Sequence, residues 1–160
     1  MLQEIEKHPS PCDVIIVLHK NGKFLLSNRT EESGSLNGQC VFPSEKREGL
    51  ETPEETFRRG ILEEMGPGVV VKTHNILPLT MAHTLSGNPR PFKVILSTDW
   101  EGEIVNKEKG KEVFEWVERD EVMDTLTVVQ SKLIFLMVLL EMKDLKVEDF
   151  QKAPALQIYG

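Results

Sequence analysis

Apolar and polar residues alternate with two different periods along the chain, and a period of two residues predicts a β-hairpin near its start. Residues 12–19 are apolar and β-branched, Asn21-Gly22 is a strong two-residue turn, and residues 23–28 alternate back into a second strand. The polar residues 30–39 then predict an exposed loop, and residues 40–42 predict a short third strand.

A helical period follows within the segment 45–66, EKREGLETPEETFRRGILEEMG. Thr52 is typical of an N-cap, Pro53 of a first helical residue and Glu55 of the second half of a capping box, while Gly66 should end the helix. At about 100° per residue, this helix has one apolar stripe and an adjacent acidic stripe. The apolar stripe holds Phe57, Ile61 and Met65, and the adjacent stripe holds Gly60, Glu63 and Glu64.

The rest of the pattern predicts more strands and two more helices. Residues 69–71 with 74–79 form one extended stretch and residues 92–98 another, separated by a polar turn at 85–91, and residues 112–117 form a final strand. Asp120-Glu121 opens a short helix, and residues 131–143 predict a helix that is apolar on most sides and packs against the sheet. This order predicts an α/β or α+β fold with a mixed β-sheet and helices on both faces.

Length and composition fit one domain. With 160 residues and 39% hydrophobic residues, the chain can bury an ample core, which we place at residues 12–143, with a C-terminal extension at 144–160. The extension has no predicted element, so its apolar residues 155–159 either pad a groove or partner or belong to a frayed tail. We expect a soluble, cytoplasmic protein without membrane spans. The two cysteines lack metal-type spacing, the N-terminal sequence does not resemble a signal peptide, and the longest apolar run covers only residues 133–140.

The acidic helix carries the candidate chemistry. Several carboxylates on a rigid helix suit a hard divalent cation, which takes oxygen ligands and polarises phosphate oxygens. The segment resembles the Nudix box, G-x5-E-x7-R-E-U-x-E-E-x-G-U with U aliphatic, and keeps six of the box's nine specified positions. The six are Glu51, Arg59, Ile61, Glu63, Glu64 and Gly66, and the three departures are Glu45 for the first Gly, Gly60 for the Glu after the Arg, and Pro67 for the last aliphatic residue.

This resemblance implies a Nudix-like α/β/α sandwich, and it implies a hydrolase that uses Mg²⁺ or Mn²⁺ and water to cleave the diphosphate linkage of a nucleoside diphosphate derivative. By position, Glu63 and Glu64 correspond to metal ligands or their close supports, and the backbone carbonyl of Ser44 to a further ligand. Arg59 is expected to orient the acids, and Glu51 to brace the loop before the helix.

Gly60 is the departure that bears most on activity, because the resemblance places a further metal ligand, or the base for water, at this position. A mid-helix Gly costs about 1 kcal/mol relative to Ala, so helix stability does not explain it. Either another segment approaches the backbone closely at Gly60, or the site has decayed. Our hypothesis at this point is that Glu45, Glu48 or Glu112 restores part of the missing charge.

Four residues outside the helix are secondary candidates. Glu112 precedes Trp116 by four positions, which is similar to the placement of a late family Glu that adds a ligand or base, although a surface strand-edge acid has the same pattern. Arg29, Lys46 and Arg47 are candidates for contacts with a substrate phosphate. Since the net charge of −7 repels polyanions, a small diphosphate is a better partner than nucleic acid.

Three functions remain open from the sequence. The first is a metal-dependent diphosphohydrolase, and the second is a catalytically impaired nucleotide-binding or regulatory module, indicated by Gly60. The third is an isopentenyl-diphosphate isomerase, disfavoured because that family has a reactive Cys where this chain has Ser44. A homodimer is compatible with the family, but no residue of the chain specifies one.

Overall fold

Seven strands form one mixed sheet in the computed structural model, which describes residues 12–30, 37–83, 90–106 and 110–153. The strands are β1 Asp13–Lys20, β2 Lys23–Arg29, β3 Cys40–Val41, β4 Ser44–Glu45, β5 Val70–His83, β6 Arg90–Glu101 and β7 Glu112–Glu118. Their order is β3-β2-β1-β6-β5, with β4 paired to β1 and β7 paired to β2. Only the β1–β6 pair is parallel among the described pairs, so the prediction of a mixed sheet is confirmed.

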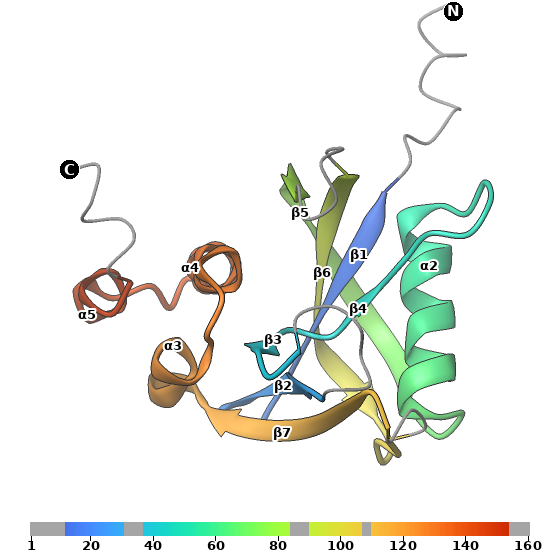
Figure 1. The fold of residues 1–160 in the computed structure, drawn as a ribbon, viewed down its shortest axis with the longest axis horizontal. Helices are drawn as coiled ribbons and strands as arrows, with labels where there is room; N and C mark the ends of the chain where they lie inside the picture. The colour runs from blue at the N-terminus through green and yellow to red at the C-terminus, as the bar shows by residue number, and fades with distance from the viewer. Residues whose placement is uncertain (1–11, 31–36, 84–89, 107–109, 154–160) are drawn as a thin grey trace, which may run out of the picture.

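Helices cover both faces of this sheet (Figure 1). On one face lies α2 (Pro53–Gly60), which continues into a π-helical turn at Ile61–Met65. On the other face lie α3 (Val122–Thr125) and α4 (Val129–Glu141), followed by α5 (Val147–Gln151). The helices that the element order predicted on both faces are therefore present, and the fold is the α/β/α sandwich that the resemblance implied.

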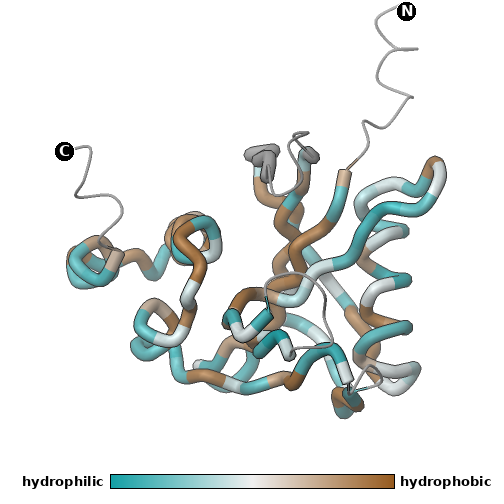
Figure 2. Tube along the Cα trace, in the orientation of Figure 1, coloured by the Kyte–Doolittle hydropathy of each residue, from teal (hydrophilic) through white to brown (hydrophobic). Residues whose placement is uncertain are grey.

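The two cores follow from the alternation of side chains along β1. Val14, Ile16 and Leu18 are fully buried on the α2 side, where they meet Phe57 and the other apolar residues of the helix stripe. Val17 points to the opposite side, into the core that α4 closes. Figure 2 shows the hydrophobic residues concentrated along the central strands and α4. Because β1 is apolar on both faces, it holds the two layers together.

Some elements were not predicted, or were predicted only roughly. The hairpin, the capped helix and the strands at 92–98 and 112–117 match β1, β2, α2, β6 and β7 within a few residues. Strand β4 was not predicted, because two polar residues carry no periodic signal. Most of the turn predicted at 85–91 lies outside the described residues. No helix among the described residues is both long enough and apolar enough to cross a bilayer.

The C-terminal extension contains a docked helix. Arg119, in a 3-10 turn at Arg119–Glu121, donates to both carboxylate oxygens of Asp149 on α5, at 2.6 and 2.7 Å. The same guanidinium reaches the Asp144 carboxylate at 2.8 Å and its backbone carbonyl at 2.6 Å. Asp149 is only 4% exposed, and the neighbouring Ala153 belongs to the core under α4. Residues 144–153 of the extension are therefore docked on the fold, whereas residues 155–159, for which a groove, a partner or a frayed tail was left open, lie outside the described residues.

We expect Arg119→Met to lower the free energy of unfolding by about 3 kcal/mol, because it leaves the Asp149 carboxylate buried without its cation. The control is Lys23→Met, which removes a cation from an exposed pair with Glu118 at 3.7 Å and should cost less than about 1 kcal/mol. Urea denaturation followed by circular dichroism measures both. Equal costs for the two variants would contradict the structural role given to Arg119.

Candidate functional site

The candidate site is built on the start of α2. The Thr52 hydroxyl accepts from the Glu55 amide at 3.2 Å, and the Glu55 carboxylate accepts from the Thr52 amide at 3.3 Å. Both halves of the predicted capping box are thus present, and Pro53 opens the helix. Gly66 ends the π-helical turn with φ of 96°, a conformation that favours glycine. The caps fix where the acidic stripe begins and ends.

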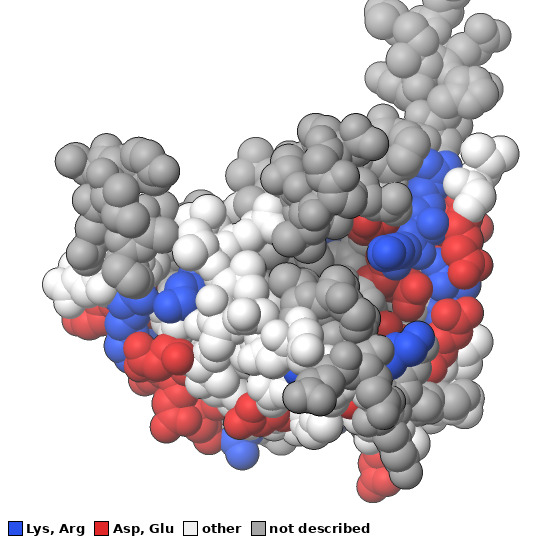
Figure 3. Space-filling view, in the orientation of Figure 1, with Lys and Arg blue, Asp and Glu red and all other residues white. Residues whose placement is uncertain are grey.

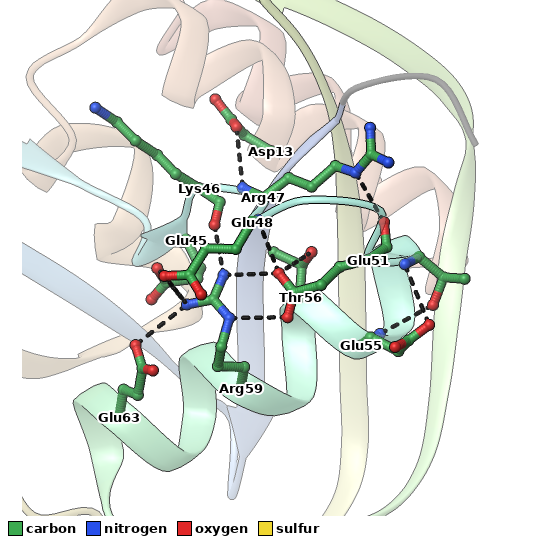
Figure 4. Close-up of polar contacts among 11 residues, drawn as sticks. Asp13, Glu45, Lys46, Arg47, Glu48, Glu51, Glu55, Thr56, Arg59 and Glu63 are labelled. Carbon is green, nitrogen blue, oxygen red and sulfur yellow. Dashed lines mark hydrogen bonds and ion pairs between the residues drawn. The ribbon is translucent and has the colours of Figure 1, made fainter. Parts of the chain in front are cut away.

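Arg59 lies at the centre of the polar contacts between α2 and the loop before it (Figure 4). Its Nε and one Nη donate to the two oxygens of Glu51, both at 2.9 Å, in a bidentate pair. The Nη2 atom also donates to the backbone carbonyl of Lys46 at 2.6 Å. The Nη1 atom meets Glu45 and Glu63, both at 3.1 Å. A fourth carboxylate, that of Glu48, lies 3.6 Å away.

Glu51 braces this loop in addition to binding Arg59. Its carboxylate accepts from the Glu48 amide at 2.8 Å and from the Thr56 hydroxyl at 3.3 Å. The hydrogen bonds from Arg59 hold the pKa of Glu51 down at about 2, well below its ordinary 4.5, and Glu51 in turn raises the pKa of Arg59. Both groups therefore stay charged at neutral pH, and their bidentate pair, which the sequence did not predict, joins the helix to the loop before it.

The two consecutive acids of the box have different environments. Glu63 has a side chain that is 49% exposed and turns back to Arg59, one helical turn earlier. Glu64 is buried, with 7% of its surface exposed, and lies on the sheet side of the π-helical turn. Ser44 lies on β4 and pairs with Ile15 of β1, so its backbone is held by the sheet. The structure thus holds Ser44 and both acids on rigid elements.

Gly60 is approached closely by β4. A Cβ atom built on Gly60 would lie 2.8 Å from the Glu45 Cβ, 3.1 Å from the Glu45 Cγ and 3.1 Å from the Ile16 Cδ1. Real Cβ atoms almost never come within 3.0 Å of another heavy atom, so the Glu45 side chain occupies the space that a larger residue 60 would need. The sequence left two explanations open for this glycine. The structure shows the first of them, because the Glu45 side chain lies close to the Gly60 backbone.

Glu112 is buried at the start of β7, with 1% of its surface exposed, so the reading of a surface acid is wrong. Its carboxylate accepts a hydrogen bond from Ser27 and pairs with Arg29 at 3.5 Å, both on the neighbouring β2. Strand alternation places these three side chains on the face that carries α2, because Leu25 two residues before Ser27 packs there. The sequence analysis did not identify Ser27 as a candidate site residue. The signal that could have identified it is a polar residue next to the apolar residues of a predicted strand.

Lys46 and Arg47 have different roles in the loop. The Arg47 Nε donates to the Glu51 carbonyl at 2.9 Å and its backbone amide to the Asp13 carboxylate at 3.3 Å, so Arg47 helps to hold the loop. Lys46 is exposed, and its side chain points away from Arg59 (Figure 4). Figure 3 shows basic and acidic side chains side by side over α2 and this loop. Of the two residues, Lys46 has the side chain more accessible to a bound anion.

The donors at this site suit a hard divalent cation in kind. All four side chains that meet the Arg59 guanidinium are carboxylates, and Mg²⁺ and Mn²⁺ prefer oxygen ligands. Within the described residues, no three His, Cys, Asp or Glu side chains are already gathered as a metal centre. A carboxylate has several lone pairs, so one that accepts from Arg59 can also coordinate a cation.

The fold and this site define an α/β/α sandwich with an arginine-braced acidic helix. The chain also matches the NUDIX domain over residues 8–137, and it therefore belongs to the Nudix family. No curated protein matches the chain.

Solved structures with the same fold include several Nudix hydrolases. The MutT Nudix hydrolase from Burkholderia pseudomallei superimposes with a TM-score of 0.65 at 22% identity, covering 80% of this chain and 97% of its own. A MutT protein from Methanosarcina mazei Go1 superimposes with a TM-score of 0.66 at 20% identity, and the match covers 88% of this chain and 99% of that protein. An ADP compounds hydrolase superimposes with a TM-score of 0.67 at 15% identity, and the match covers 84% of this chain and 75% of that protein. At these identities the similarity establishes the fold.

We expect the stabilisation by Glu51 to depend on pH with a definite sign. Because folding lowers its pKa from 4.5 to about 2, the stabilisation is complete above about pH 4.5 and is lost as the pH falls toward 2. The free energy of unfolding of the wild type should therefore exceed that of Glu51→Gln by less at pH 3 than at pH 7. Urea denaturation at the two pH values measures this, and a constant difference would contradict the assignment.

Proposed function

We propose that this Nudix protein is a metal-dependent hydrolase that cleaves the diphosphate linkage of a small nucleoside diphosphate derivative. The observation that carries the proposal is the Arg59 cluster, which holds the Glu63 and Glu45 carboxylates against one guanidinium nitrogen at 3.1 Å each. Glu64 is adjacent in sequence and buried on a rigid turn. A cluster held this firmly has its orientation fixed before a ligand arrives, which is what catalysis by positioning requires.

The proposed roles follow from where each residue lies. Glu63, Glu64, Glu112 and the Ser44 carbonyl are the proposed holders of Mg²⁺ or Mn²⁺, which when bound neutralises phosphate charge and lowers the pKa of water. Arg59 and Glu51 keep the acids and the loop in place. In the reaction, the water oxygen forms a bond to one phosphorus, the bond from that phosphorus to the bridging oxygen breaks, and the bridging oxygen leaves on the other phosphate. The water gives up its protons to the product phosphates or to solvent, so each product carries a terminal phosphate.

Contacts with the substrate are assigned by exposure and charge. Lys46 is exposed beside the cluster, and Arg29 lies on the same face of the sheet with a side chain that is 19% exposed. Both can contact a phosphate, while Arg47 is proposed to act mainly through the loop that it holds. A net charge of −7 makes these local cations and the metal necessary for any anionic ligand, which favours a small substrate.

A panel of nucleoside diphosphate derivatives with Mg²⁺ or Mn²⁺ tests the proposal, and nucleoside monophosphate release is the readout. We expect turnover by the wild type and a loss of about 100-fold or more in kcat/KM for Glu64→Gln, because the metal loses a charged oxygen ligand. Glu141→Gln, at an exposed position at the end of α4, is the control and should match the wild type.

A second candidate is a nucleotide-binding module without turnover, and the observation that favours it is Gly60. If the wild type binds nucleotides saturably but releases no product with either metal, the binding module replaces the hydrolase as the assigned function.

Equal activity of Glu64→Gln and the wild type would show that turnover occurs without this acid and would contradict the proposed site.

A further inference from the structure

Two departures from the Nudix box touch each other in the structure. The box has Gly at its first position and Glu after its Arg, whereas this chain has Glu45 at the first and Gly60 at the second. The two residues are fifteen positions apart in sequence, yet the Glu45 Cβ lies 2.8 Å from where a Cβ of residue 60 would be. Glu45 therefore occupies the space that Gly60 leaves.

The backbone gives no separate reason for glycine at position 60. Gly60 has φ of −60° and ψ of −44°, which is ordinary right-handed helix that any residue adopts. A glycine here weakens the helix relative to alanine, since it has more freedom to lose on folding. The contact with β4 is what a side chain at residue 60 would violate, so the glycine accommodates Glu45.

Strand pairing fixes the position of Glu45. Glu45 pairs with Val14 of β1, so its backbone cannot retreat from α2 without breaking the β1–β4 ladder. Its side chain is 16% exposed and runs across Gly60 to the Arg59 Nη1 atom. Figure 4 shows Glu45 and Glu63 pointing to the same end of the Arg59 guanidinium, one from β4 and one from the helix.

We propose that Glu45 and Gly60 are a reciprocal exchange, in which β4 supplies across Gly60 the metal-binding carboxylate that residue 60 of the helix does not. This inference rests on the proposed metal-dependent function. It selects Glu45 from the three candidates by position, because Glu48 is 70% exposed on the loop and Glu112, proposed above as a separate holder of the metal, lies on β7 beside Ser27 and Arg29. Glu45 alone among the three packs directly on Gly60.

Four variants of the full chain test the exchange, with Mn²⁺ alone as the probe and its affinity measured by electron paramagnetic resonance. Glu45→Gln should weaken Mn²⁺ binding at least about tenfold, because it removes a charged ligand but keeps the shape. Glu54→Gln, on an exposed position of the same helix, is the matched control and should bind as the wild type does. Gly60→Glu alone should lower Tm by roughly 4 °C or more, because its Cβ meets Glu45.

Of the four variants, the double variant Glu45→Gly with Gly60→Glu tests the exchange most directly. It removes the clash and returns the carboxylate to the helix, so Tm should rise above that of Gly60→Glu and Mn²⁺ affinity should return close to the wild-type value. Unchanged Mn²⁺ affinity in Glu45→Gln, or a double variant no better than Gly60→Glu, would overturn the exchange. So would a wild type that binds no Mn²⁺.

The exchange and the hydrolase fail in distinguishable ways. Mn²⁺ binding that depends on Glu45, without turnover of any substrate in the panel, supports the exchange and refutes the hydrolase. Turnover by the wild type that Glu45→Gln retains, with Mn²⁺ affinity also retained, supports the hydrolase and refutes the exchange.

Discussion

The guanidinium of Arg59 joins three parts of the molecule that the chain separates. It binds Glu51 near the end of the loop, the Lys46 carbonyl at the start of the loop, and Glu63 on the turn after α2. Without this cation, the four carboxylates that it contacts would lie near one another without the charge that joins them, and like charges repel. The loop conformation and the direction of the acids therefore depend on one planar side chain whose fork of donors matches carboxylates.

The sheet supplies the second constraint, since Arg59 can organise the loop only if the loop is already close to α2. Two residues of β4 pair with β1, and the Ile16 amide donates to the Pro43 carbonyl at 2.8 Å. The apolar side chains of β1 pack under the same helix, so one strand positions both the helix and the loop that crosses it. A site made of charged residues thus takes its rigidity from buried, uncharged ones.

Local signals in the sequence were sufficient for the elements whose cause is local. The capping box, the Asn21-Gly22 turn and the apolar stripe of α2 depend on residues a few positions apart, and the structure confirms all three. The bidentate pair of Arg59 with Glu51 was not predicted, because the resemblance assigned Arg59 to the acids of the helix and Glu51 to the loop. Strand β4 and helix α5 escaped prediction, because two residues of strand and five of helix have almost no periodicity.

By itself, the sequence determined the element order, the helix caps and the acids that the helix carries, because side chains three or four positions apart share a helical face. Only the tertiary structure decided that Glu45 fills the space above Gly60, and that Glu112 is buried against Ser27 and Arg29 rather than exposed. Those contacts join residues from 15 to 85 positions apart. Strand pairing brings such residues together, and the register of that pairing is set by the burial of a whole sheet rather than by the residues in contact.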